Sequence, residues 1–295
     1  MQEVAKPATK PMIRLARVGS MMLPRREYSE QRGPRRQARK TGYPAGEDPP
    51  LYPVIPLFGL PLPGYGLMVG LGILLGSLVR RQELRRLGYG VQPGHRWVGV
   101  GALIGAMFGS KIGMLLFLPA ADFQALVEQM LSLDFTGKTV VGGMFGGYLG
   151  VEITKKIVGI RESTGDGFAV GVAVAQGVGR IGCLLNGCCF GEHSELPWAL
   201  SLGDGIPRHP APLYESLLTL GLAAWLWSIR TRPRPRGRLF RYFLIGFAAI
   251  RLGMEFLRGD NGWSVGPLTA VQWVCVATIV GFGALIWRED RGGVG

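Results

Sequence analysis

Long apolar segments without charged residues recur along this chain, and they constrain its fold more than any other feature. No charged residue occurs between Pro49 and Val79, and the segment Ser264–Trp287 is also uncharged. About 20 consecutive apolar residues are enough for a helix to cross a bilayer. Only 18% of the residues are charged, against roughly 25% in typical soluble domains. The sequence therefore predicts an all-α, polytopic membrane protein.

Seven segments are predicted to be transmembrane helices, with a small loop region on the outer side. In order they are Tyr65–Val79, Trp97–Leu118, Thr139–Val151, Gly167–Leu185, Pro212–Ile229, Tyr242–Leu257 and Ser264–Trp287. The transmembrane domain is predicted over residues 51–290. Residues 1–50 are basic, rich in Arg, Pro and Gln, and lack an apolar period, so we predict a disordered tail. No apolar stretch follows Met1, so no cleaved secretory signal is expected.

The loops between these segments differ in charge, and this difference predicts their orientation. Lys and Arg gather in loops 80–96, 155–161 and 230–241, whereas loops 119–138 and 186–211 are richer in acids. Because basic loops stay in the cytoplasm, we predict the N-terminus outside and the C-terminus inside. The net charge of +13 is then explained by orientation and the basic tail, so nucleic acid is not expected as a partner. Helical spacing of apolar residues within 119–138 also predicts a short helix on the outer leaflet.

Glycines repeat every four residues in the second and third predicted spans. They are Gly101, Gly105, Gly109 and Gly113 in one span, and Gly142, Gly146 and Gly150 in the other. Such a row forms one small helix face, which lets two helix backbones approach closely in a lipid environment. We interpret both rows as helix packing surfaces.

Ionisable residues inside the predicted spans are the candidates for function, because a charge at membrane depth is costly without a partner or cavity. They are Lys111, Arg180, Glu215, Arg251 and Glu255. Arg251 and Glu255 share a helix face at i,i+4 spacing, and Arg258 is predicted to extend that face. Arg180 and Arg251 near the outer ends of their spans predict a site for an anion, most simply a lipid phosphate. Snorkelling or internal ion pairing is the alternative, and would satisfy Arg258 and Glu215.

The run Gly177-Val178-Gly179-Arg180-Ile181-Gly182 formally matches the dinucleotide-binding pattern G-x-G-x-x-G. That pattern needs a strand before it and an amphipathic helix after it, whereas here a predicted membrane span precedes it. We therefore exclude a dinucleotide site. We expect these glycines to end a helix beside a bound lipid.

Three cysteines, Cys183, Cys188 and Cys189, cluster on the predicted outer side. Their spacing C-x4-C-C is not a common zinc pattern, so neither a metal nor another cofactor is predicted. In an oxidising compartment a disulfide from Cys183 to Cys188 or Cys189 is favoured. A reactive free thiol beside Arg180 and inert packing remain the alternatives. Cys275 is interpreted as a core residue.

Four motifs in this order resemble one family, the prolipoprotein diacylglyceryl transferases of bacterial inner membranes. The central motif is Gly179-Arg180-Ile181-Gly182, followed by Asn186-Gly187 and Gly191. Tyr65-Gly66-Leu67-Met68 resembles the first-span motif of the family, and His209-Pro210-Ala211-Pro212-Leu213-Tyr214-Glu215 resembles its His-Pro-x-x-Leu-Tyr-Glu motif. The fourth motif runs from Arg251 to Arg258. The resemblance covers roughly residues 51–290.

The resemblance implies a transferase that moves a diacylglyceryl group from phosphatidylglycerol to the lipobox cysteine of prolipoproteins, the first step of bacterial lipoprotein maturation. Its implied partners are phosphatidylglycerol, prolipoprotein signal peptides and membrane lipid. It implies a multi-pass protein of the bacterial inner membrane, in which the orientation predicted from the loop charges gives a periplasmic N-terminus and a cytoplasmic C-terminus. By carry-over, Arg180 and Arg251 hold the lipid phosphate and Glu255 orients Arg251. The other implied site residues are Tyr65 and His209 in catalysis, and Arg258, Asn186, Gly191 and Tyr214 in lipid binding.

The sequence also departs from the family pattern at three positions. The family has a histidine in its third span, and Val140–Gly150 contains none. It has Asn where Cys183 stands and Glu where Cys188 stands. We consider two substitutes for the missing histidine. Either His209 acts as the base, or an arginine lowers the pKa of the acceptor thiol. An altered paralogue that binds lipid or signal peptide, or that uses another acceptor, is the alternative function. A transporter is disfavoured because internal repeats are not evident.

Overall fold

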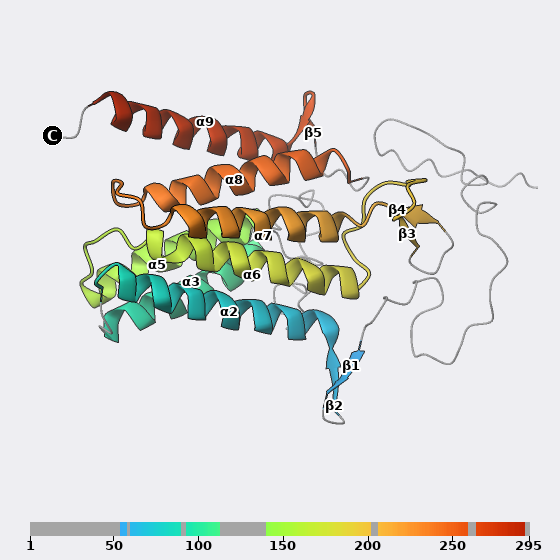
Figure 1. Ribbon diagram of the computed structural model, residues 1–295, viewed down its shortest axis with the longest axis horizontal. Coiled ribbons are helices and arrows are strands. Elements are labelled where there is room, and N and C mark those ends of the chain that lie inside the picture. The colour runs from blue at the N-terminus through green and yellow to red at the C-terminus, as the bar shows by residue number, and fades with distance from the viewer. Residues whose placement is uncertain are drawn as a thin grey trace, which may run out of the picture. The chain divides into compact units, whose positions relative to one another are not determined.

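Seven helices account for most of the residues that the computed structural model describes, which are 54–57, 60–89, 93–112, 140–201, 206–258 and 264–292. The helices are α2 (Gly64–Arg86), α3 (Pro93–Ile112), α5 (Val140–Val158), α6 (Asp166–Leu185), α7 (Ala211–Ile229), α8 (Arg238–Glu255) and α9 (Ala270–Arg291) (Figure 1). The predicted all-α class is thereby confirmed. The predicted tail over 1–50 and the predicted helix within 119–138 lie outside the described residues.

Three short antiparallel hairpins accompany these helices. They pair β1 (Val54–Leu57) with β2 (Leu60–Pro63), β3 (Leu200–Ser201) with β4 (Pro207–Arg208), and β5 (Ser264–Val265) with β6 (Leu268–Thr269). The first hairpin leads directly into α2, and the third leads directly into α9. The first and third hairpins therefore fix the backbone just before a helix begins. The second hairpin is followed by two residues and then by α7.

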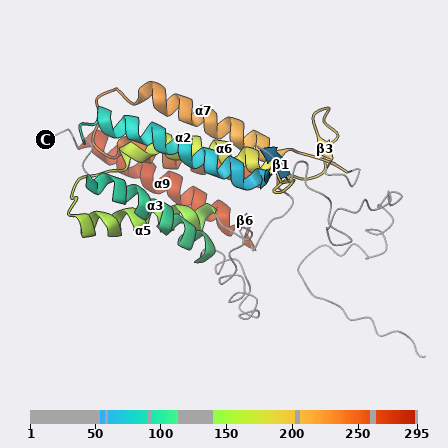
Figure 2. The same ribbon diagram turned by 90° about the horizontal axis from the view of Figure 1, so that it is seen from below.

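The two glycine rows pack α3 against α5, as predicted. A Cβ atom added at Gly101 would lie 2.8 Å from the carbonyl oxygen of Gly150, and one added at Gly109 would lie 2.6 Å from the Cα atom of Gly146. Figure 2 shows the two helices side by side. Because only glycine leaves room at these contacts, the two backbones pack directly on each other. Gly113 lies outside the described residues.

A second glycine contact, between α2 and α6, was not predicted. A Cβ atom at Gly76 would lie 2.5 Å from the carbonyl oxygen of Gly171, and one at Gly171 would lie 2.6 Å from that of Gly76. Gly72 approaches the backbone of Ala175 in the same way. Gly72 and Gly76 also recur at a spacing of four residues, so the same sequence signal was present in the first span.

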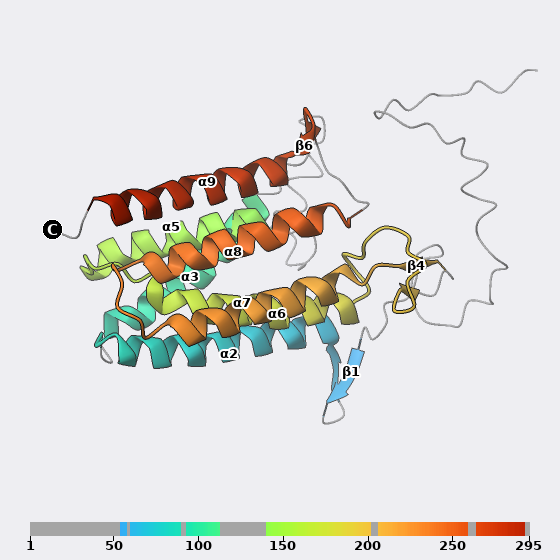
Figure 3. The same ribbon diagram turned by 45° about the horizontal axis from the view of Figure 1, so that its top comes forward.

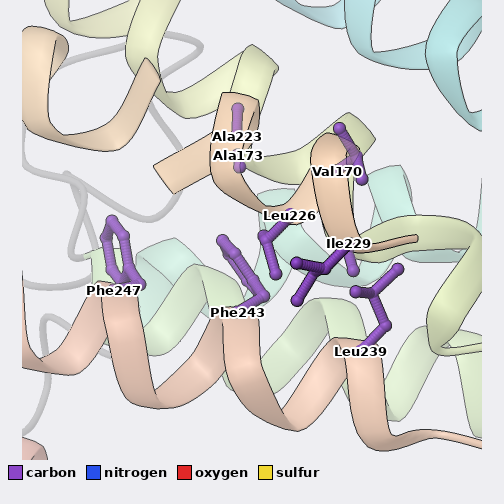
Figure 4. Close-up of a cluster of buried hydrophobic side chains, with 9 residues drawn as sticks. Val170, Ala173, Ala223, Leu226, Ile229, Leu239, Phe243 and Phe247 are labelled. Atoms are coloured by element: carbon purple, nitrogen blue, oxygen red, sulfur yellow. The ribbon is translucent and has the colours of Figure 1, made fainter. Parts of the chain in front are cut away.

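The hydrophobic core lies between α6, α7 and α8 (Figure 4). Its buried members are Ala169, Val170 and Ala173 on α6, Ala223, Leu226 and Ile229 on α7, and Leu239, Phe243 and Phe247 on α8. Side chains from all three helices therefore pack into one buried apolar cluster. A hydroxyl adds a polar contact to this packing, because Ser216 Oγ on α7 donates to the Gly177 carbonyl of α6 over 2.7 Å.

Several predicted boundaries are wrong. Helix α2 continues to Arg86, so four arginines that were assigned to a loop lie in its last two turns. Helix α5 continues to Val158, seven residues past the predicted end at Val151, and Lys155 pairs with Glu152 within it. Each extension contains one ion pair between residues a single turn apart, Glu83–Arg86 in α2 and Glu152–Lys155 in α5. Ser264–Thr269, assigned to the last span, instead forms the β5–β6 hairpin.

The expectation that Gly177–Gly182 ends a helix is also wrong. Helix α6 runs through all of these residues and stops at Leu185, with Asn186 as its C-cap. Gly177 and Gly182 are buried inside the helix, where Leu220 and Met68 respectively lie against them. The glycines at those two positions therefore make room for neighbouring helices.

Two of the described helices, α6 and α9, satisfy length and composition criteria for a membrane span. Half of the apolar window of α6 is buried by its neighbours, whereas only 11% of that of α9 is buried. The described structure thus supports an apolar helical bundle. The number of helices that cross the membrane stays a prediction at this point.

Candidate functional site

Most predicted site residues gather at one end of the bundle, which we call the site end. There α6 and α8 end, α2, α7 and α9 begin, and the β3–β4 hairpin follows α6 (Figures 1 and 3). Helices of alternating direction bring residues that are far apart in the sequence to this end. Residues of all four sequence motifs therefore lie at this end.

The first feature of the site end is a buried ion pair between two helices. Arg180 Nη2 on α6 lies 2.8 Å from Glu215 Oε1 on α7, and both side chains are less than a tenth exposed. A buried arginine keeps its charge when a carboxylate stands beside it. Sequence reasoning foresaw internal pairing for Glu215, but not that its partner would be Arg180.

A second ion pair lies at the end of α8. Arg251 Nη2 is 2.7 Å from Glu255 Oε2, so the predicted pairing along one helix face is confirmed. Glu255 Oε1 also accepts a hydrogen bond of 3.3 Å from the Thr269 hydroxyl at the start of α9. Arg251 Nη1 is buried and has no hydrogen-bond partner among the described residues. Arg251 is therefore held in place on one side and keeps an N–H group to offer on the other.

Thr269 was missed by the sequence analysis. Its side chain caps α9 by accepting from the backbone N–H of Gln272, while the Gln272 side chain accepts from the backbone N–H of Thr269. This reciprocal arrangement is a capping box, whose S/T-x-x-E/Q spacing was visible in the sequence. The capping residue thus also links α9 to Glu255.

Gly191 occupies a tight junction between the loop after α6, the end of α8 and the start of α7. Its N–H donates to the His209 carbonyl over 2.9 Å, and the next N–H, of Glu192, donates to the Leu257 carbonyl over 2.9 Å. A Cβ atom at Gly191 would lie 2.8 Å from the Cβ atom of His209 and closer still to the Leu257 carbonyl. Only glycine fits there, because two backbone segments approach it from different sides.

We expect Gly191→Ala to lower stability and transfer together. The added methyl group must push apart segments that two hydrogen bonds hold, a strain of about 1–3 kcal/mol for an overpacked site. Thermal unfolding in detergent measures the first effect, and product formation measures the second. Gly253→Ala is the matched control, since a Cβ atom there meets open space. Equal stability of the two variants would contradict the close approach.

His209 and Tyr214 lie next to each other at the start of α7. His209 Nδ1 is 3.5 Å from the Tyr214 hydroxyl, and the rings meet edge-on with centroids 6.1 Å apart. The indole N–H of Trp198 donates to the same hydroxyl over 2.7 Å. Trp198, which the sequence analysis did not single out, therefore orients Tyr214 beside the imidazole.

The three cysteines at the end of α6 converge. All are free, and their sulfur atoms lie within 4.8 Å of one another. Arg180 Nη1 lies 3.9 Å from the sulfur of Cys183. Hydrogen bonds from Cys183 and Cys188, together with the charges of Arg180 and Arg258, lower the pKa of the Cys189 thiol. The favoured disulfide is not present in this structure.

The remaining predicted residues occupy the same end with different exposure. Tyr65 stands in the first turn of α2, and its backbone touches α6 beside Gly182. Asn186 is exposed. Arg258 does not continue the α8 face as predicted, because the helix ends at Glu255 and Phe256 is its C-cap. Lys111 lies in the last turn of α3.

Comparison with known proteins identifies the family. The sequence profile described as "Prolipoprotein diacylglyceryl transferase" matches residues 53–288. The chain belongs to this family. The match covers all seven described helices apart from the last few residues of α9, and the whole of the site end.

Curated relatives span nearly the same length. A phosphatidylglycerol–prolipoprotein diacylglyceryl transferase of Clostridium tetani is 30% identical over 245 residues, which cover 80% of this chain and 96% of the relative. The same-named protein of Nitratidesulfovibrio vulgaris is 32% identical over 237 residues, covering 73% and 86%. That of Aromatoleum aromaticum is 33% identical over 242 residues, covering 75% and 89%. The chain is therefore a transferase of this family.

Proposed function

We propose that this protein moves the diacylglyceryl group of phosphatidylglycerol to the thiol of a lipobox cysteine in prolipoproteins. In this reaction a carbon–sulfur bond forms at the glyceryl carbon, and the bond from that carbon to the phosphate oxygen breaks. The thiol loses its proton, and the electron pair of the broken bond leaves with glycerol phosphate. Family membership over residues 53–288 is the observation that carries the proposal. The arrangement of arginines at the site end supports it.

Buried Arg180 and half-buried Arg251 suit a phosphate that gains charge as it leaves. A phosphodiester carries one negative charge, and the departing glycerol phosphate carries more, so fixed guanidinium groups favour the transition state over the bound lipid. Arg251 Nη1 has no hydrogen-bond partner within the described part of the chain. Glu255, itself bonded to Thr269, fixes the orientation of Arg251. Arg180 is fixed by Glu215 in the same manner. We propose that both arginines bind the phosphate.

We also propose that the helices are embedded in the bacterial inner membrane and cross it seven times. Large apolar side chains are exposed on their outer faces, including Trp97 at 60%, Phe145 at 67% and Ile157 at 77%. Soluble monomers rarely expose contiguous apolar faces of this kind. Arg and Lys cluster at the ends of α2 and α5 and at the start of α8. These clusters lie at the end of the bundle opposite the site end and support a cytoplasmic location for it.

This orientation predicts a periplasmic N-terminus and a cytoplasmic C-terminus, and it can be tested directly. Two reporters are used, one active only in the cytoplasm and one active only in the periplasm. Each is fused after Arg236 and, in a separate fusion, after Glu195. We expect the Arg236 fusion to be cytoplasmic and the Glu195 fusion to be periplasmic. Reversal at both positions would contradict the proposed topology.

Rescue of a bacterial strain depleted of its own diacylglyceryl transferase tests the function in cells. We expect expression of this protein to restore growth and to restore the mass of a reporter lipoprotein with its attached lipid. An altered paralogue that only binds lipid or signal peptide would be expressed in the membrane and restore neither. That result, with normal protein levels, would refute the proposal.

A further inference from the structure

The three sulfur atoms at the site end have a geometry that the proposed function does not use. Cys183, Cys188 and Cys189 converge although their spacing in the chain is irregular, and all three thiols are free. In a tetrahedral zinc site the metal–sulfur bonds are about 2.3 Å, which places the sulfur atoms about 3.8 Å apart. In the structure the three sulfur atoms lie within 4.8 Å of one another. Small side-chain rotations can shorten these sulfur–sulfur distances to the value that zinc requires.

The backbone is bent so as to bring the two later cysteines back to the first. Gly187 has a φ of 65° and Cys189 a φ of 62°, which makes Cys189 the only described residue besides glycine with a positive φ. The N–H of Cys188 donates to the Cys183 carbonyl over 3.1 Å, which closes the turn. A side-chain-bearing residue in the left-handed region is uncommon and gathers at functional sites.

The surroundings of the cluster suit negatively charged sulfur. Arg180 Nη1 lies 3.9 Å from the sulfur of Cys183, and both residues are buried. Donors to metal-bound thiolates are a usual outer shell of a metal site. Arg180 and Cys183 are three residues apart on α6, so they lie on the same helix face.

We propose that Cys183, Cys188 and Cys189 bind one zinc ion whose fourth position accepts the thiolate of the substrate cysteine. Among the described residues, the cluster contains these three ligands and no fourth His, Cys, Asp or Glu. Three protein ligands with one open position are typical of catalytic rather than structural zinc. The inference rests on the proposed function, because it assigns the activation of the acceptor thiol in that reaction to this cluster.

The chemistry of the transfer explains what zinc contributes. A cysteine thiol with a pKa of about 8.5 is only about 3% thiolate at pH 7. When the thiol binds zinc its proton passes to water, and the thiolate sulfur then forms the bond to the glyceryl carbon. The phosphate oxygen takes the electron pair of the broken carbon–oxygen bond, and no electron donor or acceptor is needed. Arg180, a proposed phosphate ligand, also lies 3.9 Å from the sulfur of Cys183, so the cluster adjoins the proposed phosphate site.

Metal content and cobalt spectroscopy of the purified full-length protein test the site without relying on activity. We expect about one zinc per chain in the parent protein. The control variant Cys275→Ser, whose cysteine lies in α9, should bind as much zinc, whereas Cys183→Ser and Cys189→Ser should lose it. Cobalt in place of zinc should give thiolate charge-transfer and tetrahedral bands. A lipobox peptide should shift those bands, whereas the same peptide with serine for cysteine should not.

Transfer measurements separate this proposal from the proposed function. Chelation of zinc should lower the transfer rate about 30-fold at pH 7, and the loss should shrink as the pH approaches 8.5. Added zinc should restore the rate. Parent-level transfer without metal, an unshifted cobalt spectrum, or a mass that shows a disulfide among the three cysteines would overturn the zinc site and leave the transferase function standing. Peptide-shifted cobalt bands without any transfer would support the metal site and refute the function.

Discussion

Arg180→Lys is expected to lower the rate of diacylglyceryl transfer about 10²-fold, the usual effect of losing one preorganised donor to developing negative charge. Lysine keeps the positive charge but not the planar fork of donors. It can still pair with Glu215, which now lies 2.8 Å from the guanidinium, so we expect the variant to fold. The initial rate of lipid attachment to a lipobox peptide is the measurement.

Arg241→Lys provides the matched control. Arg241 also forms an ion pair, with Glu289, but that pair joins the start of α8 to the end of α9, away from the site end. We expect its transfer rate to stay near that of the parent. If Arg180→Lys transferred lipid as fast as Arg241→Lys, Arg180 would not be a phosphate ligand.

Arg251→Ala is expected to abolish transfer and also to destabilise the protein. The substitution leaves the buried carboxylate of Glu255 without its partner at 2.7 Å. Removing one member of a buried ion pair costs about 3–5 kcal/mol. Loss of activity alone would therefore not distinguish phosphate binding from a structural role.

The double variant Arg251→Ala/Glu255→Ala makes that distinction. Without the carboxylate there is no unpaired buried charge, so we expect much of the lost thermal stability to return. Transfer should stay absent, because the N–H group offered by Arg251 Nη1 is still missing. Recovery of transfer along with stability would assign Arg251 a structural role only.

The helices could be predicted from the sequence because their signals are local. Apolar length identified seven segments, and glycines at four-residue spacing identified the α3–α5 contact. Boundaries were harder to predict. Arg80 to Arg86 were assigned to a loop by their charge, yet within α2 Arg86 pairs with the buried Glu83. A partner one turn away can keep charged residues helical where hydropathy alone predicts an end.

The site could be predicted only where its contacts are local or carried by a motif. Arg251 and Glu255 pair along one helix face, which their spacing already indicated. Arg180 and Glu215 are on different helices, so their pairing depends on how α6 packs against α7. The convergence of the three sulfur atoms depends on positive φ values at Gly187 and Cys189. Spacing along the chain does not reveal such a turn.

Mass analysis of a lipobox peptide incubated with the purified protein in phosphatidylglycerol vesicles tests the central claim most directly. We predict that the peptide gains the mass of one diacylglyceryl group on its cysteine, with one glycerol phosphate released for each peptide modified. Vesicles of phosphatidylcholine alone, and a peptide with serine in place of the cysteine, should give no product. An unmodified peptide in phosphatidylglycerol vesicles, with protein that is folded and bound to the lipid, would contradict the account.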